Sequence, residues 1–132
     1  MPPKASSTIL DSIRRLSPQE FEDLVAEVYR REGYLVEQTG HGRSDVGYDL
    51  VLLREKMSVL VQCKHWLVKQ IGTAPVRALA GAMHNVGATG GVCITTGKFT
   101  KPAREFAISM AIELVDGKAL IRRFSRGIRK AA

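Results

Sequence analysis

The sequence is short of cysteines and has no long apolar run, and both absences argue against whole classes of protein. Its two cysteines, Cys63 and Cys93, lie inside apolar stretches without a second Cys or His at metal-ligand spacing, which favours reduced, buried thiols in a cytoplasmic protein. No apolar run approaches the roughly 18 residues of a membrane span. The first ten residues, MPPKASSTIL, also lack the apolar core of a secretory signal peptide. We therefore expect a cytoplasmic protein without a membrane partner.

Acidic side chains are missing from one long section of the chain. The net charge is +7, and residues 56–104 contain seven Lys or Arg side chains but no Asp or Glu. A surface with charges of one sign attracts phosphate groups, although a solvated basic surface that keeps the protein soluble is an equal alternative at this point. The basic end of the chain carries the same signal more weakly, because it could also be a disordered terminus.

Helix and strand patterns alternate along the 132 residues, which fit one domain. Ser17, Pro18 and Glu20 form a capping box that begins a helix, and Gly33 ends it. The remaining patterns predict a strand at 34–38, strands at 47–53 and 58–64 with a connection at 54–57, a helix capped by Thr73 and ending near Gly87, a strand at 90–96, a helix at 100–110 and a strand at 112–117. The order αβββαβαβ predicts an α/β domain with a central mixed sheet flanked by helices.

The domain is expected to occupy residues 16–123, between an N-terminal extension at 1–15 and a basic C-terminal tail at 124–132. Within the second and third helices, the apolar spacing predicts two sets of inward-facing side chains. These sets are Val76, Ala80 and Met83, and Phe106, Ala107 and Met110.

Three polar residues interrupt the two apolar strands at 47–53 and 58–64, namely Asp49, Gln62 and Lys64. A buried polar group without a partner costs on the order of 2–7 kcal/mol, so these side chains require an explanation. If Leu53 pairs with Ser58, Asp49 lies opposite Gln62, and alternation places Lys64 on the same face. On the first helix, Glu22 borders the apolar stripe and is the carboxylate aimed toward the sheet. The four polar side chains are therefore predicted to converge on one patch.

The residue types in this patch suit phosphodiester chemistry. A carboxylate pair and an amide supply the hard oxygen ligands that Mg²⁺ accepts, with waters completing the octahedron. A nearby lysine can orient the attacking water and offset the charge of the transition state. Spacing alone leaves a second interpretation open, in which Lys64 and Asp49 form a buried ion pair and no metal binds.

In this order, the residues resemble the PD-(D/E)XK nuclease superfamily, and specifically the catalytic domain of Mrr-type restriction endonucleases. The resemblance extends from about Leu16 to Leu120. The stretches that carry it are LSPQEFEDLVAEVYRREGY, GRSDVGYDLVLL, VLVQCKHW, VRALAGAMHNVGATGGVCITTGKFTKPAREFA and IELVDGKAL.

The resemblance implies a restriction-endonuclease-like three-layer fold and a Mg²⁺-dependent endodeoxyribonuclease in the 16–123 domain, with Mn²⁺ as a substitute and defence against foreign DNA as its role. It implies that Asp49 is the principal metal ligand, that Glu22 is an accessory carboxylate and that Lys64 is the catalytic lysine. Gln62 stands where most members of the superfamily have Asp or Glu, a variant that is usual for Mrr-like members. The missing negative charge should weaken the affinity for Mg²⁺.

Two other functions stay open, a DNA-binding module without turnover and a nuclease similar to Holliday-junction resolvases. Two kinds of protein partner also stay open, a second copy of the chain and a separate specificity module or subunit. Asp45 is expected to have a turn role, and His65 a structural one. Contacts to the DNA backbone are expected from basic residues of the acid-free section, namely Lys69, Arg77, Lys98, Lys101 and Arg104.

Overall fold

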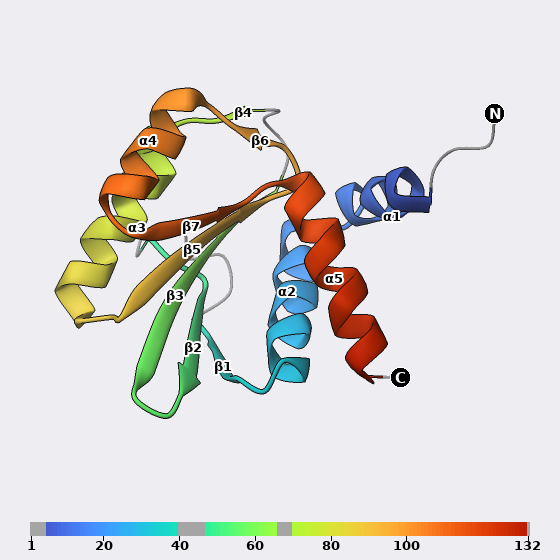
Figure 1. Cartoon of the computed structure of the whole chain (residues 1–132), viewed down its shortest axis with the longest axis horizontal. Coiled ribbons are helices and arrows are strands. Elements are labelled where there is room, and N and C mark those ends of the chain that lie inside the picture. Colours follow the sequence, from blue (N-terminus) through green and yellow to red (C-terminus); the bar gives the residue numbers. More distant parts are fainter. Residues whose placement is uncertain (1–4, 40–46, 66–69, 132) are drawn as a thin grey trace.

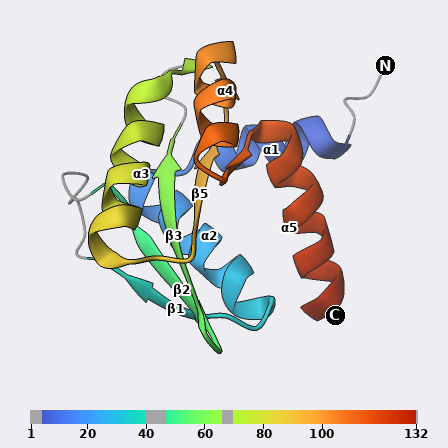
Figure 2. The same cartoon turned by 60° about the vertical axis from the view of Figure 1, so that its left-hand side comes forward.

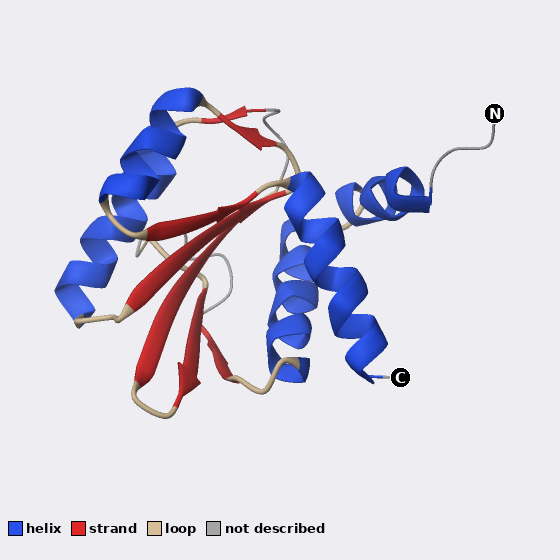
Figure 3. Ribbon diagram, in the orientation of Figure 1, coloured by secondary structure: helices blue, strands red, loops and turns tan. Residues whose placement is uncertain are grey.

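A five-stranded mixed sheet forms the centre of the molecule in the computed structural model, which describes residues 5–39, 47–65 and 70–131. Figure 1 and Figure 3 show the sheet between two layers of helices. The strand order is β1-β2-β3-β5-β7. The strands are β1 (Leu35–Gln38), β2 (Leu50–Arg54), β3 (Met57–Lys64), β5 (Gly90–Thr95) and β7 (Ile112–Val115). The predicted α/β class with a mixed central sheet is therefore confirmed.

The antiparallel and parallel parts of the sheet meet at β3. Strands β1, β2 and β3 pair antiparallel, whereas β3, β5 and β7 pair parallel. Leu53 lies opposite Ser58, as the sequence predicted. The predicted four-residue connection is wrong, because Arg54 pairs with Met57 and only two residues form the turn. One of them, Glu55, has a φ of 54°, the left-handed conformation that such a tight hairpin requires.

The helices cover both faces of the sheet, as the two views in Figure 1 and Figure 2 show. On one face, Phe21 and Val25 pack with Leu50, Leu52 and Val61 in one apolar core. On the other face, a second core joins buried side chains that include Leu60, Leu79, Cys93 and Ala103. The first face carries α1 (Ala5–Arg14), α2 (Pro18–Arg31) and α5 (Gly117–Ala131), and the second carries α3 (Thr73–Val86) and α4 (Lys101–Ser109). No helix in the described part of the chain is long and apolar enough to cross a bilayer.

Local signals fix some helix ends and not others. The capping box at Ser17 is present, with the Glu20 N–H donating to Ser17 Oγ at 3.1 Å and the Ser17 N–H donating to Glu20 Oε1 at 2.8 Å. Thr73 is not the cap of α3, because Gly72 takes that position without a side-chain hydrogen bond. Met110 does not face inward either: it follows the end of α4 and is 42% exposed.

Helices α1 and α5 and a small second sheet were not predicted from the sequence. The small sheet pairs β4 (Gln70–Ile71) with β6 (Lys98–Phe99) in parallel. The basic C-terminal tail, for which disorder was one possibility, is part of α5, which continues to Ala131. Ile121 and Phe124 are buried in this helix and attach it to the core beside α2. The arginines between these apolar residues made the segment look solvated in the sequence.

Candidate functional site

Asp49 lies immediately before β2 and is held against β3 by hydrogen bonds. Its N–H donates to Val61 O at 2.7 Å, and its Oδ2 accepts the Cys63 N–H at 2.7 Å. The Asp49 carbonyl accepts the Thr39 N–H at 2.9 Å. The other carboxylate oxygen, Oδ1, accepts no hydrogen bond from the described residues. The backbone therefore fixes the position of this carboxylate and leaves one oxygen for a ligand.

Burial raises the pKa of Asp49, while the hydrogen bond from Cys63 and the charge of Lys64 act in the opposite direction. A desolvated carboxylate gains more from a nearby cation than a solvated one does. Because the charge of Lys64 acts on the pKa of Asp49, the two groups lie within electrostatic range of each other. Yet Lys64 makes no ion pair within 4.0 Å with any described residue, which argues against the simple ion-pair interpretation.

Gln62 is a buried amide whose oxygen lacks a partner. The residue is only 3% exposed, and its Oε1 accepts no hydrogen bond within the described part of the chain. By alternation along β3, Gln62 lies on the same face as Leu60, toward α3 and α4. Leaving a buried acceptor unsatisfied costs about 1–3 kcal/mol. An oxygen kept in that state can accept a cation or a water.

Lys64 ends β3 and lies opposite Thr95 of β5. It is half-buried, and its charge also acts on Cys93, one strand away. Burial raises the pKa of Cys93 to about 12, against the influence of Lys64. The Cys93 thiol therefore stays protonated at neutral pH and provides no thiolate for a metal. The end of the sheet where β3, β5 and β7 finish is called the carboxyl end below.

Glu22 approaches from the opposite face of the sheet, because it belongs to α2. It is 8% exposed, and Gln38 of β1 donates its Nε2–H to Glu22 Oε1 at 3.2 Å. Glu22 and Asp49 both add to the effect of burial in raising the pKa of Cys63, so each lies within electrostatic range of that residue. Asp49 is thus hydrogen-bonded to β3 and lies within electrostatic range of Lys64. Glu22, which was predicted to converge with them, lies on the other face of the sheet and is held by Gln38, a residue that was not singled out from the sequence.

These side chains fit a hard divalent cation. Asp49 and Glu22 are carboxylates, and Gln62 adds a buried oxygen without a partner. Mg²⁺ and Mn²⁺ accept such oxygen ligands together with water. The described residues include no group of three or more His, Cys, Asp or Glu side chains that could hold a metal, so an all-charged or thiolate site is not formed there. With a metal bound, the amide oxygen of Gln62 would be the third protein donor beside the two carboxylates.

The residues that were expected to contact DNA are surface cations where the structure describes them: Arg77, Lys98, Lys101 and Arg104 are all exposed. The Arg77 guanidinium lies 4.7 Å from the centre of the Phe106 ring. Lys101 lies 3.9 Å from Glu105 in an exposed pair. Lys69, expected to contact DNA, and Asp45, expected in a turn, lie outside the described residues, so both roles stay predictions.

His65, next to Lys64, packs inside the protein. Its ring makes an edge-to-face contact with Phe21 at 5.3 Å between ring centres, and its Nε2 lies 3.4 Å from Ile13 O. These contacts connect the end of β3 to α2 and to the end of α1, which agrees with the structural role expected for His65.

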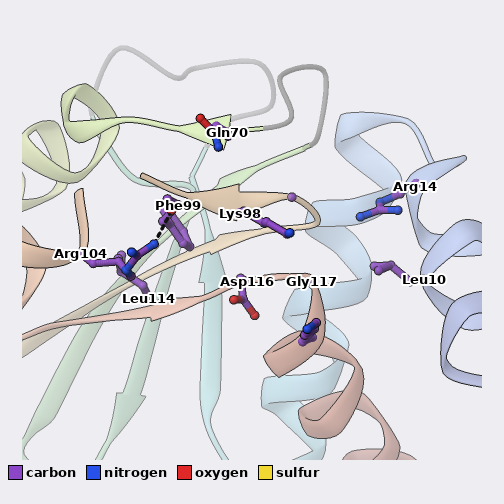
Figure 4. A pocket seen from close by; sticks show the side chains of 11 residues that line it. Leu10, Arg14, Gln70, Lys98, Phe99, Arg104, Leu114, Asp116 and Gly117 are labelled. Atoms are coloured by element: carbon purple, nitrogen blue, oxygen red, sulfur yellow. Dashed lines mark hydrogen bonds between the residues drawn. The ribbon is translucent and has the colours of Figure 1, made fainter. Parts of the chain in front are cut away.

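A pocket of about 390 Å³ lies at the carboxyl end of β5 and β7, and the sequence analysis did not predict it (Figure 4). Its charged lining comes from Arg14, Lys98, Arg104, Asp116 and Lys118. Lys98 and Arg104 were predicted as DNA contacts, whereas Arg14 and Lys118 were not. No local pattern could have joined these residues, because they come from four separate elements.

A family model and a curated relative both identify the chain as similar to restriction endonucleases. The Mrr_cat family model, described as restriction endonuclease, matches residues 13–124. The type IV methyl-directed restriction enzyme EcoKMrr of Escherichia coli (strain K12) is 36% identical over 125 residues, which cover 86% of this chain. The chain spans about 40% of the length of that relative.

Two solved restriction endonucleases have a similar fold. The DNA modification-dependent restriction endonuclease AspBHI superposes with a TM-score of 0.75 at 17% identity, covering 98% of this chain and 38% of that one. The MspJI restriction endonuclease in complex with a 27-mer oligonucleotide gives a TM-score of 0.67 at 20% identity, covering 99% of this chain and 34% of that one. The arrangement of the sheet and its helices is therefore that of restriction endonucleases.

Proposed function

Since the chain belongs to the Mrr_cat restriction endonuclease family, we propose that it is a Mg²⁺-dependent endodeoxyribonuclease that cleaves foreign DNA in the cytoplasm. The observation that carries this proposal is that the buried Oε1 of Gln62 has no hydrogen-bond partner among the described residues, on the strand that also positions Asp49 and Lys64. A buried acceptor without a partner is costly in a structural core. Such an acceptor can instead coordinate a metal ion or accept a hydrogen bond from one of the waters bound to the ion.

In this proposal Asp49, Gln62 and Glu22 hold the metal, with Asp49 as the principal ligand. When bound, the ion lowers the pKa of a water molecule and offsets the negative charge that develops on the phosphate. The Cys63 N–H keeps Asp49 Oδ2 occupied, which directs Oδ1 to the ligand side. The hydrogen bond from Gln38 holds the Glu22 side chain in place, and Glu22 is proposed as an accessory ligand of the metal.

Lys64 is proposed as the catalytic lysine. Its position at the end of β3, beside Asp49, allows the ammonium group to orient the attacking water and to donate hydrogen bonds to a phosphate oxygen. Without an ion pair to any described carboxylate, its charge is available to the substrate. Removing such a group costs roughly 100-fold or more in rate.

The exposed cations of α3, β6 and α4 are proposed to contact the sugar-phosphate backbone of the duplex. Such contacts position DNA without reading its sequence. We therefore expect DNA selection to come from a separate module or subunit, or from pairing with a second copy of the chain.

The proposal is tested by incubating the purified protein with plasmid DNA in Mg²⁺, Mn²⁺ or EDTA, beside Asp49→Asn and the matched control Glu27→Gln. Glu27 is an exposed carboxylate on α2 that pairs with Arg31. We expect cleavage by the wild-type protein and by Glu27→Gln with either metal, none in EDTA, and a loss of roughly 100-fold or more in Asp49→Asn. Cleavage that is equal in Asp49→Asn, or absent from the wild type with every metal, contradicts the proposal.

A second candidate function is a DNA-binding module without turnover. It is favoured by the neutral side chain at Gln62 and by the bond from Gln38 to Glu22, which together reduce the negative charge offered to a metal. Salt-dependent DNA binding without cleavage of plasmid or of four-way junctions would support this candidate. Preferential cleavage of junctions would instead indicate an activity similar to junction resolvases.

A further inference from the structure

The pocket at the carboxyl end of β5 and β7 lies apart from the residues proposed to hold the metal. Figure 4 shows Lys98 between Arg104 on one side and Arg14 on the other, with Asp116 and Gly117 below them. The volume of about 390 Å³ is within the range of sites that bind small ligands or ligand groups. None of Asp49, Gln62 and Lys64 lines it, so the pocket requires its own explanation.

The charge of the pocket is strongly positive. Arg14 of α1, Lys98 of β6, Arg104 of α4 and Lys118 of α5 contribute four cations, and Asp116 is the single carboxylate among the described residues that line the pocket. Asp116 is itself engaged, because its Oδ1 accepts the Ala119 N–H at 3.0 Å and so caps the first turn of α5. Arg14 also forms an ion pair with Asp11 at 4.0 Å. Four cations from four elements around one engaged carboxylate still leave an excess of positive charge, which suits an anion.

Backbone hydrogen bonds hold the two arginines of this site, whereas the two lysines have no such contact to a described residue. Arg14 donates its Nη2–H to Thr96 O at 2.9 Å, and Arg104 donates its Nη1–H to Phe99 O at 2.7 Å, so backbone carbonyls orient both guanidinium groups. Lys98 and Lys118 form no ion pair with any residue that the structure describes. The two arginines therefore shape the pocket, and the two lysines have free ammonium groups for a ligand.

The pocket is also placed suitably for a DNA strand that reaches Lys64. Strands β3, β5 and β7 are neighbours and end at the same edge, and neighbouring strands lie about 4.8 Å apart. Strand β7 thus lies about 10 Å from β3 across the sheet, a separation that a short stretch of one DNA strand can span.

We propose that this pocket binds a non-scissile phosphodiester group of the same DNA strand that is cleaved beside Lys64. The inference rests on the proposed function, because it takes DNA as the ligand. It goes further by assigning a second phosphate site with Arg14, Lys98, Arg104 and Lys118 as its cations. Such a site fixes the register of the strand relative to the metal centre, which contacts from isolated surface lysines cannot do.

The test measures binding of a fluorescently labelled duplex in EDTA, where cleavage cannot interfere. The double variant Lys98→Gln/Lys118→Gln removes the two available ammonium groups. The double variant Lys56→Gln/Arg30→Gln removes the same charge from exposed positions at the hairpin turn and on α2. Circular dichroism first establishes that both variants are folded.

We expect the pocket variant to bind about tenfold more weakly at low salt and to lose about one to two units from the slope of log K against log salt, since each released phosphate contact contributes roughly 0.9. The control variant should keep the wild-type slope. Equal slopes in the two double variants, or no measurable binding of the duplex by the wild type, would overturn the proposal.

A further arm separates DNA from a free ligand. Inorganic phosphate and dAMP are added alone, and thermal unfolding is recorded for the wild type and the pocket variant. Stabilisation of the wild type by dAMP, combined with DNA binding that the pocket substitutions do not change, would assign the pocket to a free nucleotide and overturn the DNA assignment.

Failure of this inference and failure of the nuclease proposal give different results. Binding that depends on the pocket without cleavage by the wild type leaves the pocket assigned and rejects the nuclease. Cleavage that depends on Asp49, with DNA binding unchanged in the pocket variant, rejects the pocket alone.

Discussion

The two ends of the sheet differ in whether their buried polar groups have hydrogen-bond partners among the described residues. At the hairpin end, where β3, β5 and β7 begin, Arg123 donates to Tyr29 Oη at 2.8 Å and to Glu113 Oε2 at 3.0 Å. Burial raises the pKa of Tyr29, so its hydroxyl stays protonated at neutral pH. At the carboxyl end, the oxygens Gln62 Oε1 and Thr96 Oγ1 are buried without a partner among the described residues.

A satisfied polar network contributes to folding, whereas an unsatisfied one costs free energy and requires compensation elsewhere. The hairpin end has one exception, since Glu32 Oε2 is also buried without a described partner, although the Glu32 carbonyl accepts a hydrogen bond from Arg54. The four predictions below test the contrast, in order of decreasing effect.

The largest effect is expected on the rate of DNA cleavage, and only substitutions at the carboxyl end of the sheet should cause it. Lys64→Met should reduce DNA cleavage by roughly 100-fold or more, because the ammonium group beside the phosphate is lost. Lys56→Met changes the same side chain in the turn at the other end of the same hairpin and should keep the wild-type rate. The measurement is the initial rate of plasmid cleavage in Mg²⁺. Equal losses in the two variants would remove the distinction between the ends.

A loss of stability is expected at the hairpin end. Arg123→Met removes the donors to Tyr29 and Glu113 and should lower the free energy of unfolding by about 1–3 kcal/mol. Arg122→Met, at the exposed neighbouring position, should stay within about 0.5 kcal/mol of the wild type. Urea unfolding followed by circular dichroism measures both changes. A neutral Arg123→Met would mean that this network contributes no stability.

The opposite sign is expected at the carboxyl end. Gln62→Met replaces an amide whose buried oxygen has no partner among the described residues by an apolar side chain of similar size, so the metal-free protein should gain about 1 kcal/mol. The same variant should lose the stabilisation that Mg²⁺ gives to the wild type, because the amide oxygen is gone. Both effects are read from unfolding curves with and without Mg²⁺. A destabilised Gln62→Met would show that the amide has a structural partner.

The smallest effect is a pH dependence at Asp49. Its pKa in the folded protein is raised above the ordinary value of 3.8, so the folded state binds more protons than the unfolded state between these two values. The stability of the metal-free wild type should therefore fall as pH rises through this window. Asp49→Asn should lack this fall and have the higher melting temperature at pH 7, with the difference vanishing below about pH 3.8. A constant difference across pH would contradict the raised pKa.

The sequence predicted the hairpin that carries the proposed site because its signals are local. Alternation and a tight turn define the pairing of Leu53 with Ser58, and this register brings Asp49 to β3. The helical wheel likewise identified Glu22 as the inward carboxylate of α2, and it is buried. The catalytic and metal-binding roles of these residues stay predictions.

The rest depends on contacts between distant parts of the chain. Arg14 and Lys118 meet at one pocket although they come from opposite ends of the sequence, and no periodicity predicts such a meeting. The two-residue strands β4 and β6 are too short to produce a pattern. In α5, tertiary packing of Ile121 and Phe124 decides the structure against a composition that is typical of a solvated tail.

The pairing of β3 on both sides also has a consequence for the order of folding. Its antiparallel partner β2 is joined to it by a two-residue turn, and hairpins of this kind form in about 1–10 μs. Its parallel partner β5 is reached only after the crossover through α3, a slower closure over a longer loop. Asp49 and Cys63 belong to the fast hairpin, so the ligand carboxylate should be in place on β3 before the rest of the sheet assembles around it.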